Sequence, residues 1–160
     1  MSEAEIEQLS GLWEPATDEA TYWRCVRGKT GSLFSAASES GAAAGGASTP
    51  ETAAAAQFGM NLGMAFQAVD DLLDVTGDPV KMGKPTGQDI SRGLLTLPVI
   101  RVLETSSAAD QIRLDIARRS VTQATMKLVR EELRATGAGE YVREQIRSLV
   151  DAANQCLTGL

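Results

Sequence analysis

Apolar residues recur every three or four positions along most of this chain, which is the spacing of one face of an α-helix. Residues 51–76 carry a clear stripe of this kind, made of Phe58, Leu62, Ala65, Val69 and Leu72. Ser48 followed by Glu51 three residues later, with Pro50 between them, is a typical helix start. We therefore predict one long helix over residues 51–76, whose Gly59 and Gly63 either allow close helix packing or leave room for a ligand.

The same periodicity predicts helices on both sides of this one. They cover residues 1–12, about 19–41 with Thr17 or Asp18 as cap, Leu94 to Ser106 with Pro98 in the first turn, 108–135 and 140–157. The predicted inner stripe of the helix over residues 19–41 is Tyr22, Val26, Leu33 and Ala37. Residues 41–48 are rich in Ala and Gly and are predicted to form a tight corner, whereas the many Gly and Pro residues of 80–93 predict a mobile loop.

Composition supports an all-α fold. Aromatic residues make up only 4% of the chain, and alternating strand-like runs are missing. At 160 residues and 43% hydrophobic, the chain is long enough for one domain with a real core, so we expect residues 1–160 to form a single helical domain. Cys25 and Cys156 are too far apart for a metal-binding motif and are expected to be reduced thiols.

Charge and hydropathy exclude two kinds of partner. The formal net charge is −6 and the 15 basic residues are scattered, so nucleic acid is not expected to bind. Met1–Gln8 is acidic and polar, unlike a signal peptide, and the most apolar stretch, 53–69, is interrupted by polar residues. We therefore expect a cytoplasmic protein that does not span a membrane.

Three carboxylates lie close together at the end of the predicted long helix. Asp70, Asp71 and Asp74 follow Gln67 by three, four and seven positions, so all four share a helix face. Like charges at this spacing repel each other unless a cation lies between them. Mg²⁺ fits, because it prefers oxygen ligands and the chain has no His. A solvated acidic face is the alternative that spacing alone leaves open.

Lys29 lies on the apolar face of the predicted helix over residues 19–41, between Val26 and Leu33. Burying an ammonium group without a partner is costly. The side chain therefore either reaches outward to solvent or meets an anion.

Several segments together resemble one family. One region is similar to the second aspartate-rich region of the trans-polyprenyl diphosphate synthases: Phe66-Gln67, then DDLLD and GDP, then GKPTGQDI and TLPVI. A second segment, Lys29-Thr30-Gly31-Ser32-Leu33, resembles the K-T-x-x-L segment of the same family. The resemblance implies the C-terminal part of the isoprenoid synthase helical bundle. It also implies extension of an allylic diphosphate by isopentenyl diphosphate, with a protected apolar cavity partly lined by Phe66.

The resemblance further implies a role for each matching residue. Asp70, Asp71 and Asp74 would bind Mg²⁺, while Lys29, Thr30, Gln67 and Lys84 would contact the allylic diphosphate and act in catalysis. Charge stabilisation of a leaving diphosphate is where metal ions and lysines contribute most.

The match corresponds only to about the C-terminal half of a usual synthase. Residues 1–65 contain no cluster like the first aspartate-rich motif of the family, and Leu94 stands where many members have Lys. Three hypotheses follow. The chain supplies half of a prenyltransferase site in a homo- or hetero-oligomer with another synthase chain; it is a non-catalytic partner subunit that adjusts product length; or it is an inactive truncated fragment.

Overall fold

The structure, a computed structural model, describes residues 2–83 and 85–158. The elements within these ranges are all helical, as the sequence predicts. They are α1 (Ser2–Ser10), α2 (Glu19–Val26), the π-helix η1 (Arg27–Gly31), α3 (Ser32–Ala44), α4 (Thr49–Thr76), α5 (Pro79–Met82), α6 (Gln88–Ser91), α7 (Leu97–Thr105), α8 (Ala109–Ala117), α9 (Gln123–Ala135) and α10 (Ala138–Leu157).

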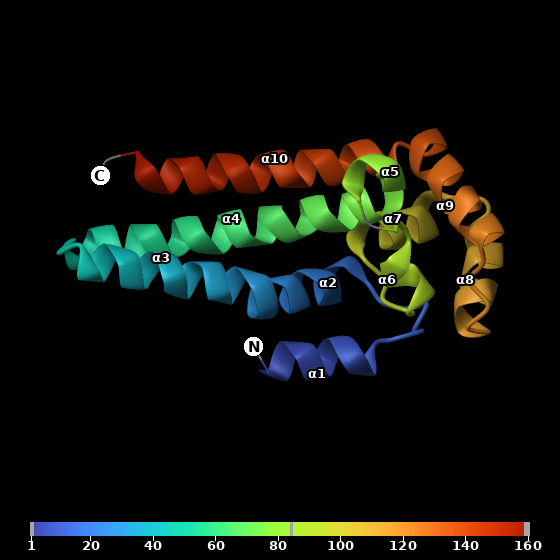
Figure 1. The fold of residues 1–160 in the computed structure, drawn as a ribbon, viewed down its shortest axis with the longest axis horizontal. Coiled ribbons are helices and arrows are strands. Elements are labelled where there is room, and N and C mark those ends of the chain that lie inside the picture. Colours follow the sequence, from blue (N-terminus) through green and yellow to red (C-terminus); the bar gives the residue numbers. More distant parts are fainter. Residues whose placement is uncertain (1, 84, 159–160) are drawn as a thin grey trace.

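The long helices lie side by side in an elongated layer (Figure 1). Helix α4 lies in the middle of the layer and packs against α3 on one side and α10 on the other. Helix α2 continues the line of α3, α1 runs beside α2, and α7, α8 and α9 close one end of the layer. No helix in the described part of the chain is both long enough and apolar enough to cross a membrane.

The hydrophobic core gathers at the end of the molecule where α7, α8 and α9 lie. Its most deeply buried side chains include Ile100, Ile112, Ile116, Val129 and Val142. At the opposite end, none of the 13 residues of α3 is buried. The largest buried apolar side chains are therefore concentrated at one end of the layer.

Two predicted helix starts are confirmed. The Ser48 amide donates a hydrogen bond to Glu51 Oε2 at 2.6 Å, so the capping box begins α4 where expected. The Thr21 amide donates to Asp18 Oδ1 at 2.8 Å and caps α2. Pro98 lies in the first turn of α7, although that helix begins at Leu97 rather than Leu94.

The predicted stripe over residues 19–41 is only half right. Tyr22 and Val26 are buried, but Leu33 is 55% exposed and Ala37 is also exposed. The π-helical turn η1 has one more residue per hydrogen-bonded ring than an α-helix, so it rotates every later side chain relative to the expected face.

The prediction of one helix over residues 108–135 is wrong. Helix α8 ends at Ala117 and α9 begins at Gln123. Arg119 adopts a left-handed conformation with φ of 54°, which an α-helix does not allow. Thr122 is the N-cap residue of α9, because its hydroxyl accepts a hydrogen bond from the Thr125 amide at 3.3 Å.

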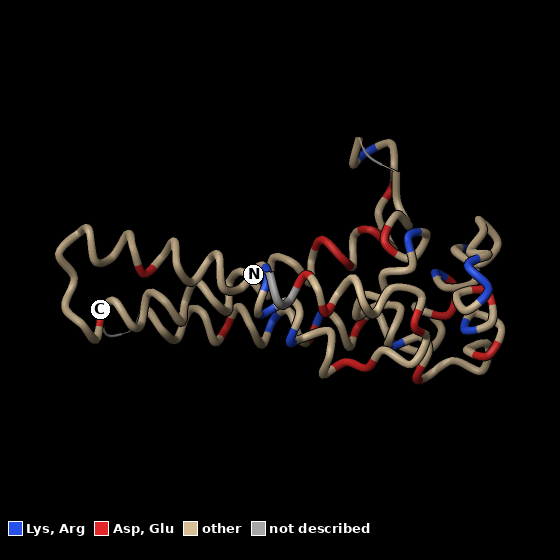
Figure 2. The backbone as a smooth tube through the Cα atoms, turned by 90° about the horizontal axis from the view of Figure 1, so that it is seen from below, with Lys and Arg blue, Asp and Glu red and all other residues tan. Residues whose placement is uncertain are grey.

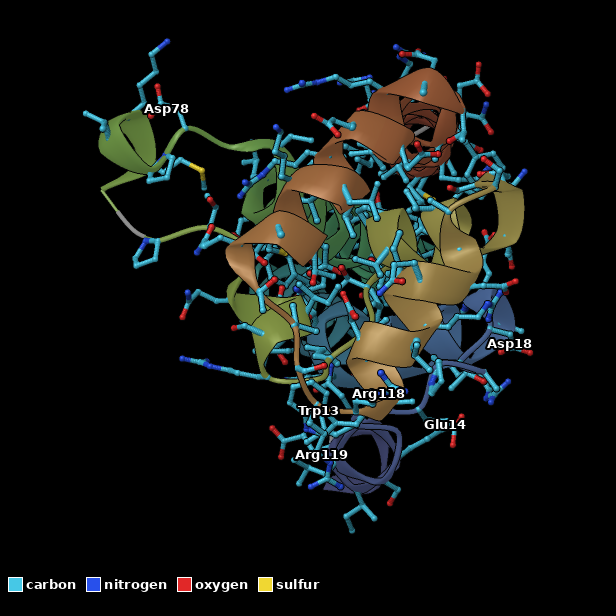
Figure 3. The ribbon with its side chains drawn as sticks, turned by 90° about the vertical axis from the view of Figure 1, so that its right-hand side faces the viewer. Trp13, Glu14, Asp18, Asp78, Arg118 and Arg119 are labelled. Atoms are coloured by element: carbon cyan, nitrogen blue, oxygen red, sulfur yellow. The ribbon has the colours of Figure 1, made fainter. Side chains whose placement is uncertain are left out.

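The loop predicted over residues 80–93 contains two short helices, α5 and α6. Asp78 caps α5, since its Oδ1 accepts a hydrogen bond from the Val80 amide at 2.9 Å, and this segment stands away from the body of the molecule (Figure 3).

The predicted stripe of α4 also needs correction. Ala65 and Leu72 are buried, whereas Leu62 is 37% exposed and Val69 is 39% exposed.

The two glycines inside α4 allow close helix packing, which is one of the two predicted alternatives. A Cβ atom at Gly59 would overlap the Phe34 carbonyl and the Ser38 hydroxyl of α3, and a Cβ at Gly63 would lie 2.8 Å from Phe34 Cβ. Helix α3 can therefore approach α4 only because both positions lack a side chain.

Replacing Gly59 with Ala is expected to destabilise the chain by about 1–3 kcal/mol, because the new methyl group must push α3 away from α4. Urea unfolding followed by circular dichroism measures the change. The control is Gly41→Ala in α3, where a Cβ meets nothing within 4 Å. That change should stabilise by roughly 0.5–1 kcal/mol through helix propensity alone. Equal effects of the two substitutions would contradict the packing argument.

Candidate functional site

A cavity of about 180 Å³ lies between α1, α2, η1, the second half of α4 and the segment before α7. The residues that line it come from five parts of the sequence, and the polar ones dominate its α4 side. The lining consists of Gln8, Gly11, Thr17, Thr21, Tyr22, Cys25, Val26, Lys29, Thr30, Gln67, Asp70, Asp71, Asp89, Leu94, Leu95 and Thr96. Five of the seven residues that the sequence predicts for the site are therefore brought together here.

The π-helical turn presents Lys29 and Thr30 to the cavity. The Lys29 side chain meets a neutral group, because its Nζ donates a hydrogen bond to Gln8 Oε1 of α1 at 3.1 Å. Thr30 Oγ1 donates to Gln67 Oε1 of α4 at 2.9 Å. Lys29 thus bonds a neutral amide oxygen, and its side chain lines the cavity.

Asp71 is held at the base of the cavity by two donors. Tyr22 OH donates to Asp71 Oδ2 at 2.7 Å, and Gln67 Nε2 donates to Asp71 Oδ1 at 2.8 Å. The pKa of Asp71 is raised to about 7, mainly by burial; the two hydrogen bonds oppose the shift, and the nearby charges of Asp89 and Asp70 add to it. Burial beside this carboxyl likewise raises the pKa of Tyr22.

Asp70 and Asp89 bring two further carboxyl groups to the cavity lining. Asp70 is half-buried on α4, and Asp89 lies on the short helix α6. Asp89 belongs to the GKPTGQDI segment, but the sequence did not assign it to the site. Its position could not be found from spacing, because α6 is brought to α4 by a contact between segments about 15 residues apart.

Asp74 makes that contact. Its Oδ1 accepts the Gln88 amide at 3.2 Å and its Oδ2 accepts the Asp89 amide at 3.1 Å. The Asp74 side chain is buried and is not part of the cavity lining. In this structure Asp74 therefore anchors the segment that carries Asp89. Its predicted metal role stays a prediction, as does the role of Lys84, which lies outside the described residues.

Sequence reasoning also missed Tyr22, Gln8 and Thr96 as site residues. Tyr22 precedes Lys29 by seven positions, which is two helical turns, so a helix-face argument could have placed both at one site. Thr96 is 3% exposed, and its hydroxyl has no hydrogen-bond partner among the described residues. An unpaired buried hydroxyl at a cavity wall is consistent with a polar ligand or water in that cavity.

The donor set at the cavity fits a hard divalent cation. In residues 2–83 and 85–158, no three acidic, histidine or cysteine side chains converge closely enough to hold a metal ion by themselves. Mg²⁺, however, is usually bound by one or two carboxylates, with waters and substrate phosphates completing its shell. Asp70 and Asp89 can supply such carboxylates, whereas Leu94 adds no charge to the lining.

Comparison with solved structures defines the class of protein. The chain superposes on a polyprenyl synthase from Caulobacter crescentus CB15, solved with calcium and isoprenyl diphosphate, with a TM-score of 0.91 and 32% identity over 98% of this chain and 48% of that chain. It matches a decaprenyl diphosphate synthase from Rhodobacter capsulatus with a TM-score of 0.88 and 34% identity, over 99% of this chain and 50% of that one. The fold is therefore that of the all-helical isoprenoid synthases.

The sequence identifies the family. The family model described as polyprenyl synthetase matches residues 1–133, so the chain belongs to the polyprenyl synthetase family. Among curated relatives, heptaprenyl diphosphate synthase component 2 of Bacillus subtilis is 34% identical over 136 residues, which are 85% of this chain and 38% of the relative. The chain spans about half the length of the solved synthases that it matches, and it corresponds to their C-terminal half. The resemblance noted in the sequence is thereby confirmed.

Proposed function

We propose that this chain supplies the diphosphate-binding half of a prenyltransferase site, which transfers the prenyl group of an allylic diphosphate to isopentenyl diphosphate. The observation that carries the proposal is the single cavity that joins Lys29 and Thr30 of the π-turn to Asp70, Asp71 and Asp89. An ammonium group and several carboxylates around one space suit a diphosphate bridged to the carboxylates by a divalent metal ion.

The residues on the basic side would bind and orient the diphosphate. Lys29 would exchange its hydrogen bond to Gln8 for a charged phosphate oxygen, a stronger hydrogen bond. Thr30 and Gln67 already bond to each other and would present their remaining polar atoms to the same group. Lys84 would add a second cation from the loop. A cavity closed from water would protect the allylic cation that forms as the diphosphate leaves.

The residues on the acidic side would hold Mg²⁺. Asp70 and Asp89 would provide carboxylate oxygens directly, and Asp71 and Asp74 would support them through the contacts described above. When bound, the metal ion supplies charge stabilisation to the leaving diphosphate. The support for a divalent ion is the oxygen-only donor set and the calcium in the Caulobacter crescentus synthase.

The other half of the site would come from a second polypeptide segment. This chain matches only about half of each solved synthase, and one relative bears the name component 2, which indicates a synthase made of more than one component. We propose that residues 1–160 act as one helical unit in such a homo- or hetero-oligomer, in the cytoplasm. A non-catalytic partner subunit is the competing function. Lys29, Gln67 and Asp70 line one cavity, and this favours the catalytic function. A purely regulatory subunit does not need these three residues together.

The test is prenyl transfer from an allylic primer to labelled isopentenyl diphosphate in the presence of Mg²⁺. Residues 1–160 alone should show no turnover, because they match only about half of each solved synthase. Addition of the N-terminal half of the Rhodobacter capsulatus decaprenyl synthase, which this chain does not match, should restore measurable transfer. Turnover by the isolated chain would contradict the half-site proposal. A complex that forms without any transfer would favour the regulatory function.

A further inference from the structure

A projecting loop separates the two helices that carry the carboxylates of the candidate site. We call the described residues 77–83 and 85, which include α5, the α5 loop. It follows the C-terminus of α4 and leads to α6, which carries Asp89. Figure 2 shows the α5 loop projecting from the body of the molecule, and an open cavity of about 720 Å³ lies between the loop and α9. The position of Asp89 therefore depends on how the two ends of this loop are held.

Arg130 of α9 contacts both ends of the α5 loop. Its Nε donates a hydrogen bond to the carbonyl oxygen of Val75, which lies just before the loop, at 2.8 Å. Its Nη2 donates to Oγ1 of Thr86, which lies directly after the loop, at 3.0 Å. The guanidinium group is planar and holds its donors in a fixed geometry. One half-buried side chain thus joins two segments that are 11 positions apart.

The bond to Val75 satisfies a carbonyl group that α4 cannot satisfy by itself. The last four carbonyl groups of an α-helix have no partner within the helix. In α4 the Asp74 carbonyl accepts a hydrogen bond from the Gly87 amide at 2.7 Å, and Arg130 takes the next one, that of the buried residue Val75. A buried carbonyl group without a partner is unfavourable, so loss of the guanidinium group would loosen this end of α4.

Helix α9 also packs against the segment that follows the loop. Met126 is buried and lies one turn before Arg130. A Cβ atom at Gly87 would lie 2.7 Å from Met126 Cε, so the backbone next to Thr86 approaches α9 closely. The φ angle of Gly87 is 76°, a conformation that side chains rarely allow. Packing and hydrogen bonding from α9 therefore act on the same short segment, two residues before Asp89.

We propose that Arg130 is a positioning residue for the candidate site. By joining Val75 to Thr86 it holds α6 against the end of α4, and so keeps the carboxyl groups of Asp70 and Asp89 at one cavity. Arg130 does not line that cavity and therefore acts through these segments rather than on a ligand. The inference rests on the proposed function in one respect, the role of the two carboxylates in binding Mg²⁺. Groups held in place before binding lose less conformational freedom when the ligand arrives.

Hydrogen exchange of the amides of residues 87–89, followed by NMR in EDTA, tests whether Arg130 holds the segment. Arg130→Met removes both donors and keeps an unbranched side chain. Arg134→Met is the matched control, because it removes the same charge from an exposed position one turn later on α9. We expect exchange of these amides to become about tenfold faster in Arg130→Met and to change less than about twofold in Arg134→Met.

Calorimetry with magnesium pyrophosphate as the probe tests the consequence for the site. Arg130→Met should weaken binding about tenfold and Arg134→Met less than about twofold. Arg130→Lys keeps the charge but cannot donate to both acceptors in the same geometry, so it should restore only part of the affinity. Thr86→Val removes only one of the two contacts and should give a smaller loss than Arg130→Met. Because it leaves the contact with Val75 intact, it also tests the proposal if circular dichroism shows that Arg130→Met does not fold.

The other outcomes separate this proposal from the proposed function. Equal exchange rates in the Arg130→Met and Arg134→Met variants would overturn the proposal. Faster exchange with unchanged binding of magnesium pyrophosphate would overturn it as well, because the contact would then be structural only. Full recovery by Arg130→Lys would show that charge alone is enough. If the unmodified chain bound no magnesium pyrophosphate, the proposed function would be contradicted, and faster exchange in Arg130→Met would still support the hold on Thr86.

Discussion

Replacing Asp70 with Asn should lower prenyl transfer by the reconstituted complex about 10²- to 10³-fold, the loss typical when one group that stabilises developing charge is removed. Asp70 lines the same cavity as Lys29, and its carboxylate is the proposed ligand that joins Mg²⁺ to the diphosphate. Asn keeps the size of the side chain but removes its negative charge. The rate should be measured over a series of Mg²⁺ concentrations, because the variant should also need more Mg²⁺ for half-maximal activity.

The matched control for this prediction is Asp151→Asn, which removes the same charge from an exposed position on α10. It should leave both the rate and the Mg²⁺ requirement unchanged within twofold. An Asp70→Asn complex as active as the Asp151→Asn complex would remove Asp70 from the metal role and support a regulatory subunit. Binding of magnesium pyrophosphate to the isolated chain, measured by calorimetry, gives the same comparison without turnover.

Asp71 should make the stability of the metal-free chain depend on pH. Its pKa is about 7 in the folded chain, whereas the ordinary value, expected in the unfolded chain, is 3.8. A carboxyl whose folded pKa is raised contributes stability that is fully present below the unfolded pKa and is lost as the pH rises through the folded pKa. The free energy of unfolding should therefore fall by a few kcal/mol between pH 4 and pH 8 in the presence of EDTA.

Asp71→Asn should remove most of this pH dependence. The amide stays neutral at every pH and still accepts a hydrogen bond from Tyr22, so the variant should match the unmodified chain below about pH 4 and be more stable than it near pH 8. Thermal unfolding across this pH range in EDTA measures both curves, with Asp151→Asn as the control that should follow the unmodified chain. Parallel curves for the Asp71→Asn variant and the unmodified chain would show that burial of Asp71 does not govern the pH dependence.

Local features of the fold could be predicted from the sequence because they depend on neighbouring residues. The Ser48 and Glu51 pair begins α4 through hydrogen bonds within four residues, and apolar spacing predicts the length of the helix that follows. The same local reasoning failed where packing overrides it. The π-turn before α3 rotates the later side chains, and the left-handed Arg119 follows the end of α8, both without a strong local signal.

The sequence by itself determined the helical class, the acidic face of α4 and the resemblance that names the family, because residue spacing and motif order are properties of the linear chain. Only the tertiary structure decided which of these residues meet. It placed Tyr22 against Asp71 across 49 positions, turned Asp74 toward the Gln88 and Asp89 amides, and left Leu62 and Val69 in solvent. Spacing defines a helix face, but burial of that face requires a second surface, and this is set by contacts between distant segments.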